Sequence, residues 1–405
     1  VTILSSKIWV KDESPYLITG DVKVNSGATL TITKGVEVIF LADNDDTMSG
    51  DTTYDSELRV EGTLTVQGTE AEPVLFTSSD QVKRAGQWGG IYARNGTLEH
   101  VVVEYSSYGL KGRYLTVDKG VFRYSSGEGL RSEGSGSLNL KNSEVYENNG
   151  WGVYVANAER DNMVFENNLI RENGGGFRYE TGNSFTFKDN QVLKNRGDGF
   201  NFNGQWDDRS YTIEGNLVEG NQGVGVARWS CCGRNQKLVF KKNTVRENNE
   251  GVKIWYFNSE SWGNNTSGYL KFEENTVEKN RGDGVHFGDR SNGPIYVKNN
   301  QIKDNQGVGI QFHRNRGDVE VVDNTVEGNT GYGIKIHKYD NEGSNTKSEN
   351  NYRYPSAKIL IQQNTVKKNE SWNDVNGESG ISVYYRSSAK VQVLDNVVEG
   401  GKGYG

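Results

Sequence analysis

Six aromatic residues lie in polar segments that are also rich in Asn, Asp and Arg. An indole or phenol ring beside polar groups suits the apolar face and the hydroxyl edge of a sugar ring. The same rings can instead pack these segments onto the protein or bury at a subunit contact, since Trp is a frequent interface anchor. Both interpretations stay open. The candidate ligand-binding residues are Trp206, Trp229, Trp255, Tyr256, Trp262 and Tyr384.

Acidic and basic residues next to these rings are the candidates for catalysis. Asp207 and Asp208 follow one Trp directly, and Arg228 precedes another. Paired carboxylates are what glycoside hydrolysis requires. The sequence does not complete an active site around them, so no residue is assigned as catalytic. If the protein is an enzyme, these three are the first to test.

Two groups of residues are candidate metal ligands. Asp43, Asp45 and Asp46 offer oxygen ligands for Ca²⁺, but they lack the spacing of an EF-hand loop, and a solvated loop explains them better. His313 and His337 are a candidate imidazole pair without a third ligand at a fixed spacing. We therefore expect no cofactor, with Ca²⁺ as the open alternative.

Composition limits the class of protein. The 405 residues include 51 Gly and only 4 Pro, and hydrophobic residues make up 33%. Gly without a triplet period excludes collagen, and 11% aromatic residues argue against a disordered chain. A net charge of −7 with mixed signs gives no footprint for nucleic acid. No run of 18 apolar residues exists that would predict a membrane-spanning helix.

A repeat explains the excess of Gly and Asn. The pattern N-x-[VI]-x-x-N recurs mostly every 22 to 27 residues, followed by the turn N-x-G-x-G, as at 195–199 and 305–309. Apolar residues alternate with period two on both sides of these motifs, which is the signal of short strands. Three short strands in about 22–25 residues predict an all-β coil that stacks on its copies, with parallel strands about 4.8 Å apart.

The recurrent Asn residues are predicted to be structural. An Asn at a corner tolerates positive φ, and its amide can bond to the Asn of the next coil. The first 120 residues show the strand pattern with only three Asn. We therefore expect 1–120 to form coils without Asn corners, and 121–405 to form Asn- and Gly-cornered coils of the same continuous solenoid.

The candidate residues lie where the repeat is interrupted. The insertions 203–210, 229–236, 255–268 and 337–356 all follow the strand after N-x-G-x-G, so they are expected to emerge at one corner of the coil. Loops on a rigid scaffold commonly carry function. His313 and His337 occupy the same repeat position in neighbouring coils. Cys231 and Cys232 are the only cysteines, and they form either a vicinal disulfide or two thiols.

Four N-terminal segments resemble the opening coils of secreted bacterial and archaeal members of the pectin-lyase-like superfamily: 27–40, 60–66, 73–78 and 86–91. This resemblance implies a single right-handed parallel β-helix and a secreted, extracellular or cell-surface location. It does not imply an activity. The G-H-G motif of polygalacturonase-like members and the D-P-H-E signature of alginate epimerases are both absent.

These observations favour a structural or adhesive protein. Residues 401–405 stop within the corner motif, so we expect either a fragment of a longer chain or a stack completed by another copy. Completion by a copy would give end-to-end assembly into a filament, sheath or surface layer. The alternatives are a polysaccharide lyase or hydrolase and a non-catalytic glycan-binding protein. The expected partners are copies of the chain and extracellular polysaccharide, not nucleic acid.

Overall fold

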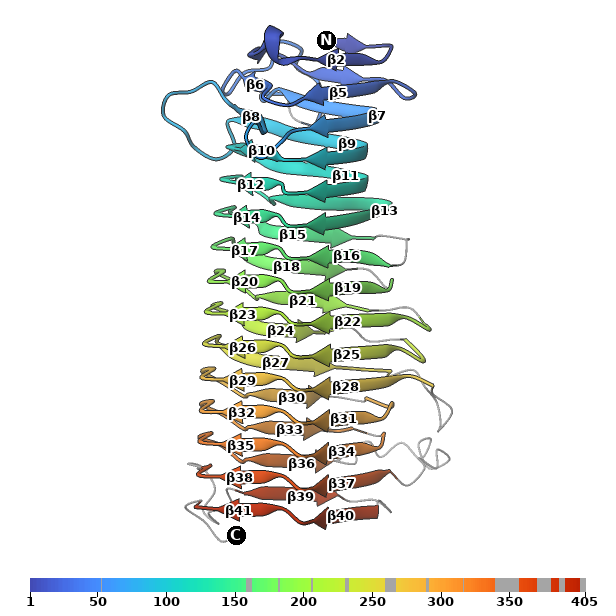
Figure 1. Cartoon of the computed structure of the whole chain (residues 1–405), viewed down its shortest axis with the longest axis vertical. Coiled ribbons are helices and arrows are strands. Elements are labelled where there is room, and N and C mark those ends of the chain that lie inside the picture. Colours follow the sequence, from blue (N-terminus) through green and yellow to red (C-terminus); the bar gives the residue numbers. More distant parts are fainter. Residues whose placement is uncertain are drawn as a thin grey trace, which may run out of the picture. The chain divides into compact units, whose positions relative to one another are not determined.

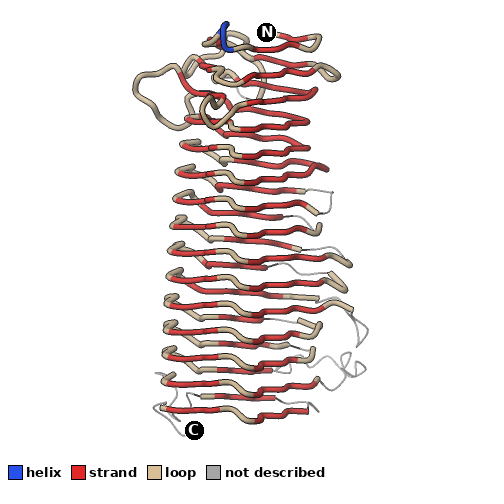
Figure 2. The backbone as a smooth tube through the Cα atoms, viewed as in Figure 1, coloured by secondary structure: helices blue, strands red, loops and turns tan. Residues whose placement is uncertain are grey.

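The computed structural model contains two compact units, Val1–Gly197 and Asp198–Gly405, which are described one at a time. In both units, strands from successive turns of the chain lie in layers (Figures 1 and 2). The structure describes residues 1–51, 53–157, 162–180, 183–204, 207–229, 233–258, 267–288, 291–315, 317–338, 357–369, 380–385 and 390–400.

The first unit contains two parallel sheets and one short 3₁₀ turn, η1 (Lys11–Glu13). The strands of its first sheet are β1 (Thr2–Ile3), β2 (Lys7–Trp9), β4 (Val22–Val24), β5 (Thr29–Thr33), β7 (Glu57–Gln67), β9 (Trp88–Glu99), β11 (Ser106–Asp118), β13 (Leu130–Lys141), β15 (Trp151–Ala156), β16 (Met163–Glu166), β18 (Gly175–Glu180) and β19 (Phe185–Lys188). The strands of its second sheet are β3 (Tyr16–Ile18), β6 (Glu37–Phe40), β8 (Val74–Ser78), β10 (Val101–Glu104), β12 (Val121–Arg123), β14 (Glu144–Tyr146), β17 (Leu169–Arg171) and β20 (Gln191–Leu193).

The second unit repeats this arrangement without helices among its described residues. Its first set of strands is β21 (Phe200–Asn203), β22 (Ser210–Glu214), β24 (Val224–Arg228), β25 (Lys237–Lys241), β27 (Glu250–Trp255), β28 (Tyr269–Glu273), β30 (Val285–Gly288), β31 (Ile295–Lys298), β33 (Ile310–His313), β34 (Val319–Val322), β36 (Ile334–Lys338), β37 (Lys358–Gln362), β39 (Ile381–Tyr385) and β40 (Lys390–Leu394). Its second set is β23 (Leu217–Glu219), β26 (Thr244–Arg246), β29 (Thr276–Glu278), β32 (Gln301–Lys303), β35 (Thr325–Glu327), β38 (Thr365–Lys367) and β41 (Val397–Glu399).

Each complete coil of the second unit contributes three strands, as the repeat predicted. In one coil these are β24, β25 and β26, and each pairs in parallel with its counterpart in the next coil, β27, β28 and β29. The predicted fold class, a right-handed parallel β-helix, is confirmed. The coils bury their alternating apolar residues inside: the rings of Phe240 and Phe272 stack with centroids 5.0 Å apart, as do those of Phe287 and Phe312.

The Asn corners form hydrogen-bonded ladders, as predicted, but the positive φ expected at these Asn lies instead on the residue before each of them, as at Glu274 with a φ of 56°. Asn275 lies between Asn243 and Asn300 of the adjacent coils. Its backbone N–H and its amide Nδ2 both donate to Oδ1 of Asn300, at 2.9 and 3.0 Å, and Nδ2 also donates to the Phe240 carbonyl at 3.0 Å. Its own Oδ1 accepts from Asn243 in the same way. Each buried amide is thus satisfied by its neighbours.

In the Asn-poor coils, and in the first coil after residue 120, two strands of the coil merge into one bent strand. β7, β9, β11 and β13 are 11 to 13 residues long. Gly112 marks the bend in β11, where the register shifts, and a Cβ there would lie 1.9 Å from the Ala93 carbonyl oxygen. β11 pairs with β13 and β12 with β14, so coils of the two corner types pair directly within the first unit.

Candidate functional site

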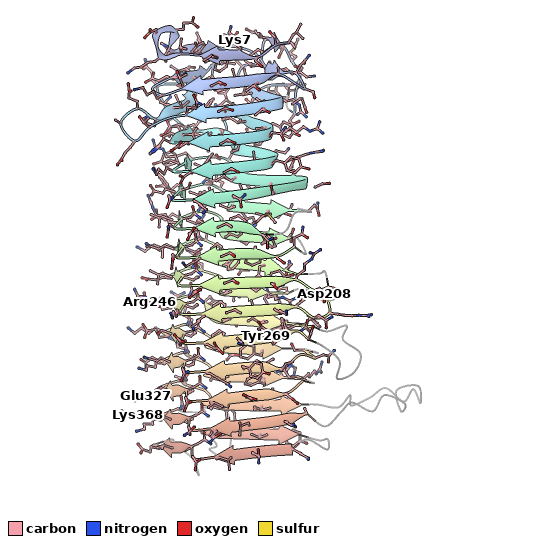
Figure 3. The ribbon with its side chains drawn as sticks, turned by 45° about the vertical axis from the view of Figure 1, so that its right-hand side comes forward. Lys7, Asp208, Arg246, Tyr269, Glu327 and Lys368 are labelled. Atoms are coloured by element: carbon pink, nitrogen blue, oxygen red, sulfur yellow. The ribbon has the colours of Figure 1, made fainter. Side chains whose placement is uncertain are left out.

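The described parts of the insertions 203–210, 229–236 and 255–268 lie at one corner of consecutive coils, as expected, whereas residues 339–356 of the fourth insertion lie outside the described residues. The segment after β21 bonds to the segment after β24, because the Asp208 N–H donates to the Arg234 carbonyl at 2.8 Å. The segment after β24 bonds in turn to the one after β27, through the Ser267 N–H and the Asn235 side chain at 3.0 Å. The described parts of these loops therefore stack along the coils (Figure 3).

The adjacent carboxylates of this corner are engaged in loop stacking. Oδ1 of Asp207 accepts the Arg234 N–H at 2.7 Å, and Oδ1 of Asp208 accepts from the Asn235 amide at 3.0 Å. Asp208 has a φ of 58° and lies at the insertion corner, where Figure 3 labels it. Their described contacts are those of turn residues, and among the described residues neither is brought next to a second catalytic group.

Arg228 lies inside the coil rather than on the loop surface. Its side chain is fully buried, and its guanidinium donates to the carbonyls of Gly204 and Trp255 at 3.0 and 2.9 Å and to Oε1 of Gln236 at 2.6 Å. The ring of Phe257 lies 5.6 Å from the guanidinium carbon. Arg228 thus links, from inside the coil, the three segments that contain Gly204, Gln236 and Trp255.

A column of rings follows the outer side of β24, β27, β30, β33, β36 and β39. The rings of Trp229 and Trp255 lie 5.0 Å apart at 63°. His286 follows Trp255 at 5.7 Å and precedes His313 at 6.3 Å. We call this set the Trp–His column; its members are Trp229, Trp255, His286, His313, His337 and Tyr384.

The register of the strands places these rings in line. His313 pairs with His337, and His337 pairs with Tyr384, whose rings lie 5.2 Å apart. The equal repeat position of the two histidines is therefore confirmed. Trp229 is 39% exposed and Tyr384 is 43% exposed, so both ends of the column are open to solvent. Tyr256 lies beside the column, with its ring 6.3 Å from Trp255.

His286 is the member of the column that the sequence analysis missed. It lies two residues before the repeat position of the other histidines and is in register with Lys253, not with Trp255. Its ring can enter the column because Gly288, which pairs with Trp255 in the next coil, has no side chain. A Cβ on Gly288 would lie 2.7 Å from the Trp255 indole. A glycine that makes room for a ring was the available signal.

Metal binding by His313 and His337 stays an alternative prediction, for which the described part of the chain offers few ligands. No group of three or more His, Cys, Asp or Glu side chains converges there in a manner that could hold an ion. His286 Nδ1 lies 3.6 Å from an Asp283 oxygen. Burial first, and then the charge of Lys335 and the nearby His313, lower the pKa of His337. Trp206, Trp262, Cys231 and Cys232 lie outside the described residues.

The acidic segment of the first unit folds into a loop in which side chains cap the backbone. Oδ1 of Asp45 accepts from the Thr47 N–H at 2.9 Å, and Oδ2 from the Ser49 N–H at 2.9 Å. Asp43 forms an ion pair with Arg84, and Asp46 accepts from the Asn44 amide at 3.2 Å. Ca²⁺ binding by this segment stays a prediction, and these contacts explain the acidic residues through the loop itself.

A buried carboxyl group lies under this loop, and the sequence analysis did not identify it. Glu57 begins β7, and its side chain is 1% exposed. Both of its oxygens lie 3.2 Å from the Asp51 N–H, and Oε2 lies 3.4 Å from the Tyr108 hydroxyl. The Glu57 N–H donates to Oδ1 of Asp21 at 3.0 Å. Only the fold brings these residues together.

Burial and the charges around Glu57 set the pKa of its carboxyl group. Burial, and then the nearby charge of Asp51, raise the pKa of Glu57 to about 7. Burial opposes the ionisation of Asp51 too, but the ammonium of Lys111, 3.2 Å away, and the guanidinium of Arg59, 3.0 Å away, lower its pKa overall. Burial and the charges of Glu57 and Asp51 raise the pKa of Tyr108. Glu57 is thus the group that titrates near neutral pH.

A hollow of about 370 Å³ lies beside this cluster. Its walls are Asp21, Lys23, Ser49, Gly50, Asp51 and Arg59. The volume lies within the range of ligand pockets, which is about 300–1,000 Å³. Glu57 does not line the hollow, because Gly50 covers it.

Comparisons with known proteins support the fold. A family model described as a right handed beta helix region matches residues 99–266 and 264–353, and one described as a pectate-lyase like beta helix domain matches residues 2–113. No curated protein matches the sequence. Among the residues that the structure describes, no helix is both long and apolar enough to cross a membrane.

Solved structures with a similar fold include two modules from Azotobacter vinelandii. The A-module of mannuronan C-5 epimerase AlgE6 has a TM-score of 0.50 at 14% identity and covers 92% of this chain and 91% of its own. The A-module of AlgE4 has the same TM-score and identity and covers 91% of both chains. The catalytic unit of an α-1,3-glucanase from Streptomyces thermodiastaticus has a TM-score of 0.37 at 11% identity, covering 96% and 61%.

Proposed function

Because this chain belongs to the right-handed β-helix family, whose coils hold outward side chains in register, we propose that it is an extracellular polysaccharide-binding protein. The Trp–His column is the observation that carries the proposal. Its rings sit on consecutive coils, so their spacing follows the strand spacing of about 4.8 Å. A polymer of sugar rings can contact several members at once, which raises affinity beyond that of one ring.

The electrostatics of the column fit sugar rather than a strongly charged ligand. The ammonium of Lys253 lies 5.8 Å from the Trp229 ring and is also paired with Glu250. Asp283 faces His286, so the charges of either sign are few and mixed. Rings with scattered polar groups are the surface that stacks on sugar and bonds to its hydroxyls.

Binding without turnover is favoured over a lyase or hydrolase. Asp207 and Asp208 each accept hydrogen bonds from the neighbouring loop, and Arg228 is buried away from any ligand. The two epimerase modules named above are named for their action on mannuronan. For this chain, that name only supplies one of the polysaccharides to test. Release of reducing or unsaturated sugar, lost in Asp207→Asn, would establish the enzyme alternative instead.

Affinity electrophoresis through gels that contain mannuronan, glucan or galactan tests the proposal. We expect the protein to be retarded in at least one gel, and Trp255→Ala to weaken retardation about tenfold, which corresponds to about 1.4 kcal/mol. Tyr269→Ala is the matched control, because Tyr269 is on β28 and outside the column (Figure 3). Equal loss in both variants, or no retardation in any gel, would reject the proposal.

Self-assembly stays a prediction from the sequence. Sedimentation velocity at rising concentration tests it: growth beyond the monomer supports assembly, and a monomer throughout contradicts it.

A further inference from the structure

Glu57, a buried acid of the first unit, lies under a short segment of loop. Ser49, Gly50 and Asp51 cross directly over the carboxyl groups of Asp21 and Glu57. A Cβ on Gly50 would lie 2.6 Å from Oε1 of Glu57 and 2.8 Å from Oδ2 of Asp21, and Gly50 has a φ of 81°. We call residues 49–51 the strap.

The strap is anchored on both sides of Gly50 by carboxylates. The Ser49 hydroxyl donates to Oδ2 of Asp21 at 2.6 Å, and its N–H donates to Asp45. The Asp51 N–H is shared between both oxygens of Glu57. The strap therefore depends directly on the charge of the groups beneath it, since three acids accept hydrogen bonds from Ser49 and Asp51.

We propose that the strap is a pH-sensitive fastening, which holds over the Asp21–Glu57 pair while Glu57 carries a proton and loosens when Glu57 ionises. Carboxylates that share a site repel when all are charged. Asp21 and Asp51 already place negative charge on both sides of Glu57, and Asp45 lies behind Asp21. Ionised Glu57 would be a buried charge beside the carboxylate of the strap's own Asp51, and its burial and this repulsion together outweigh the Asp51 N–H bond, which favours the ionised form.

The surrounding cations do not cancel this charge. Arg59 lies 3.8 Å from Glu57 but 3.0 Å from Asp51, and its Nε bonds to Glu61 at 2.8 Å. Lys111 is divided between Asp51 and Glu133, at 3.2 and 3.4 Å. The β9 segment behind Glu57 contributes Gly89, which carries no charge.

Two further groups complete the surroundings of Glu57. The Tyr108 hydroxyl has one proton for two acceptors, Asp51 at 3.2 Å and Glu57 at 3.4 Å, so it cannot satisfy both carboxylates. Asp55 precedes Glu57 in the chain, and its own pKa is raised by burial and by Asp43. Neither group supplies positive charge.

Loosening of the strap would change the hollow beside it. Ser49, Gly50 and Asp51 form half of the residues that line the hollow, and Gly50 separates it from Glu57. Release of the strap would widen the hollow and open the Glu57 carboxylate to it. This inference is independent of glycan binding by the Trp–His column, which lies in the other unit.

The sign follows from the pKa of Glu57. The native protein binds this proton more tightly than the unfolded chain, whose Glu pKa is 4.5. The strap is therefore most stable relative to its open form at low pH, loses stability as the pH rises from about 4.5, and is loosest above about 7.

Amide hydrogen exchange of the whole protein between pH 5 and pH 8, corrected for the intrinsic rate at each pH, tests the proposal. We expect protection of the Ser49 and Asp51 amides to fall at least tenfold (~1.4 kcal/mol) over this range. Glu57→Gln, which stays neutral, should retain the protection at pH 8. Glu99→Gln, at the exposed end of β9, is the matched control and should keep the wild-type pH dependence.

The wild-type experiment decides by itself if a variant fails to fold. Equal corrected protection of both amides at pH 5 and pH 8 would overturn the proposal. So would a Glu57→Gln variant that is folded by circular dichroism and still loses protection at pH 8. Protection that falls uniformly along β7, β9 and β11 would assign the pH dependence to the whole unit and also reject the strap.

Discussion

The histidine of the Trp–His column with a perturbed pKa gives a prediction for a single residue. Burial and the nearby Lys335 and His313 lower the pKa of His337, so the native protein holds it neutral. The contribution of His337 to the free energy of unfolding should therefore be full above about pH 6.5, and it should decrease as the pH falls through the native pKa. Titration of the ring by NMR should give a midpoint below 6.5, and Lys335→Gln should raise it.

A midpoint at or above 6.5 would contradict this account of the column. Lys253→Gln is the control, because Lys253 lies on β27 and does not contribute to the lowered pKa of His337.

Arg228 separates a structural role from a catalytic one at the same residue scale. Removing its guanidinium takes one buried donor from the carbonyls of Gly204 and Trp255 and one from Oε1 of Gln236. Arg228→Met should therefore lower the free energy of unfolding by about 2–4 kcal/mol, as measured by urea unfolding. Arg234→Met, at an exposed position of the same loop, should change it by less than about 0.5 kcal/mol. An unchanged stability of Arg228→Met would contradict the structural role.

The Asn ladder makes the corner of each coil a unit of stability. Asn275→Ala removes the Nδ2 donor to Asn300 and Phe240, and it removes the Oδ1 that accepts from the backbone N–H and the amide of Asn243. Because these groups are buried, we expect a loss of about 2–4 kcal/mol in thermal or urea unfolding. Lys237→Ala, on the exposed side of β25, is the control and should be nearly neutral. Similar stabilities of the two variants would show that the ladder is not stabilising.

The bends of the Asn-poor coils depend on close contact between backbones. A Cβ at Gly112 would overlap the Ala93 carbonyl oxygen, so Gly112→Ala must push β9 and β11 apart. We expect a loss of at least 2 kcal/mol in the free energy of unfolding of the first unit. Gly27→Ala is a poorer match in conformation but has open space around its Cβ, so its loss should be smaller. A larger loss for Gly27→Ala would contradict the argument.

The repeat predicted the elements well, because strand and corner positions depend on neighbours that recur in the sequence. Phe240 and Phe272 stack because each occupies the same place in its coil. The cluster around Glu57 was not predictable in this way. Asp21, Glu57 and Tyr108 belong to coils without Asn corners, and hydrogen bonds across 36 and 51 residues join them. His286 was not predicted, because it reaches the Trp–His column from another register position.

At the scale of the whole molecule, the two units carry different surfaces on one kind of scaffold. In the first unit, outward cations and rings are paired among themselves: Arg59 lies over Tyr92 at 4.5 Å and Arg131 over Tyr154 at 4.9 Å, with acidic partners beside them. In the second, Trp229 and Tyr384 leave large parts of their rings to solvent. The second surface is the one available for a polymer.

The indole N–H signals of the protein during titration with the polysaccharide that retards it test the central claim most directly. The account predicts shifts at Trp229 and Trp255 that saturate together with binding, and none at Trp88, which is fully buried in the first unit. Binding that leaves Trp229 and Trp255 unshifted would contradict the assignment of the Trp–His column as the glycan-binding surface.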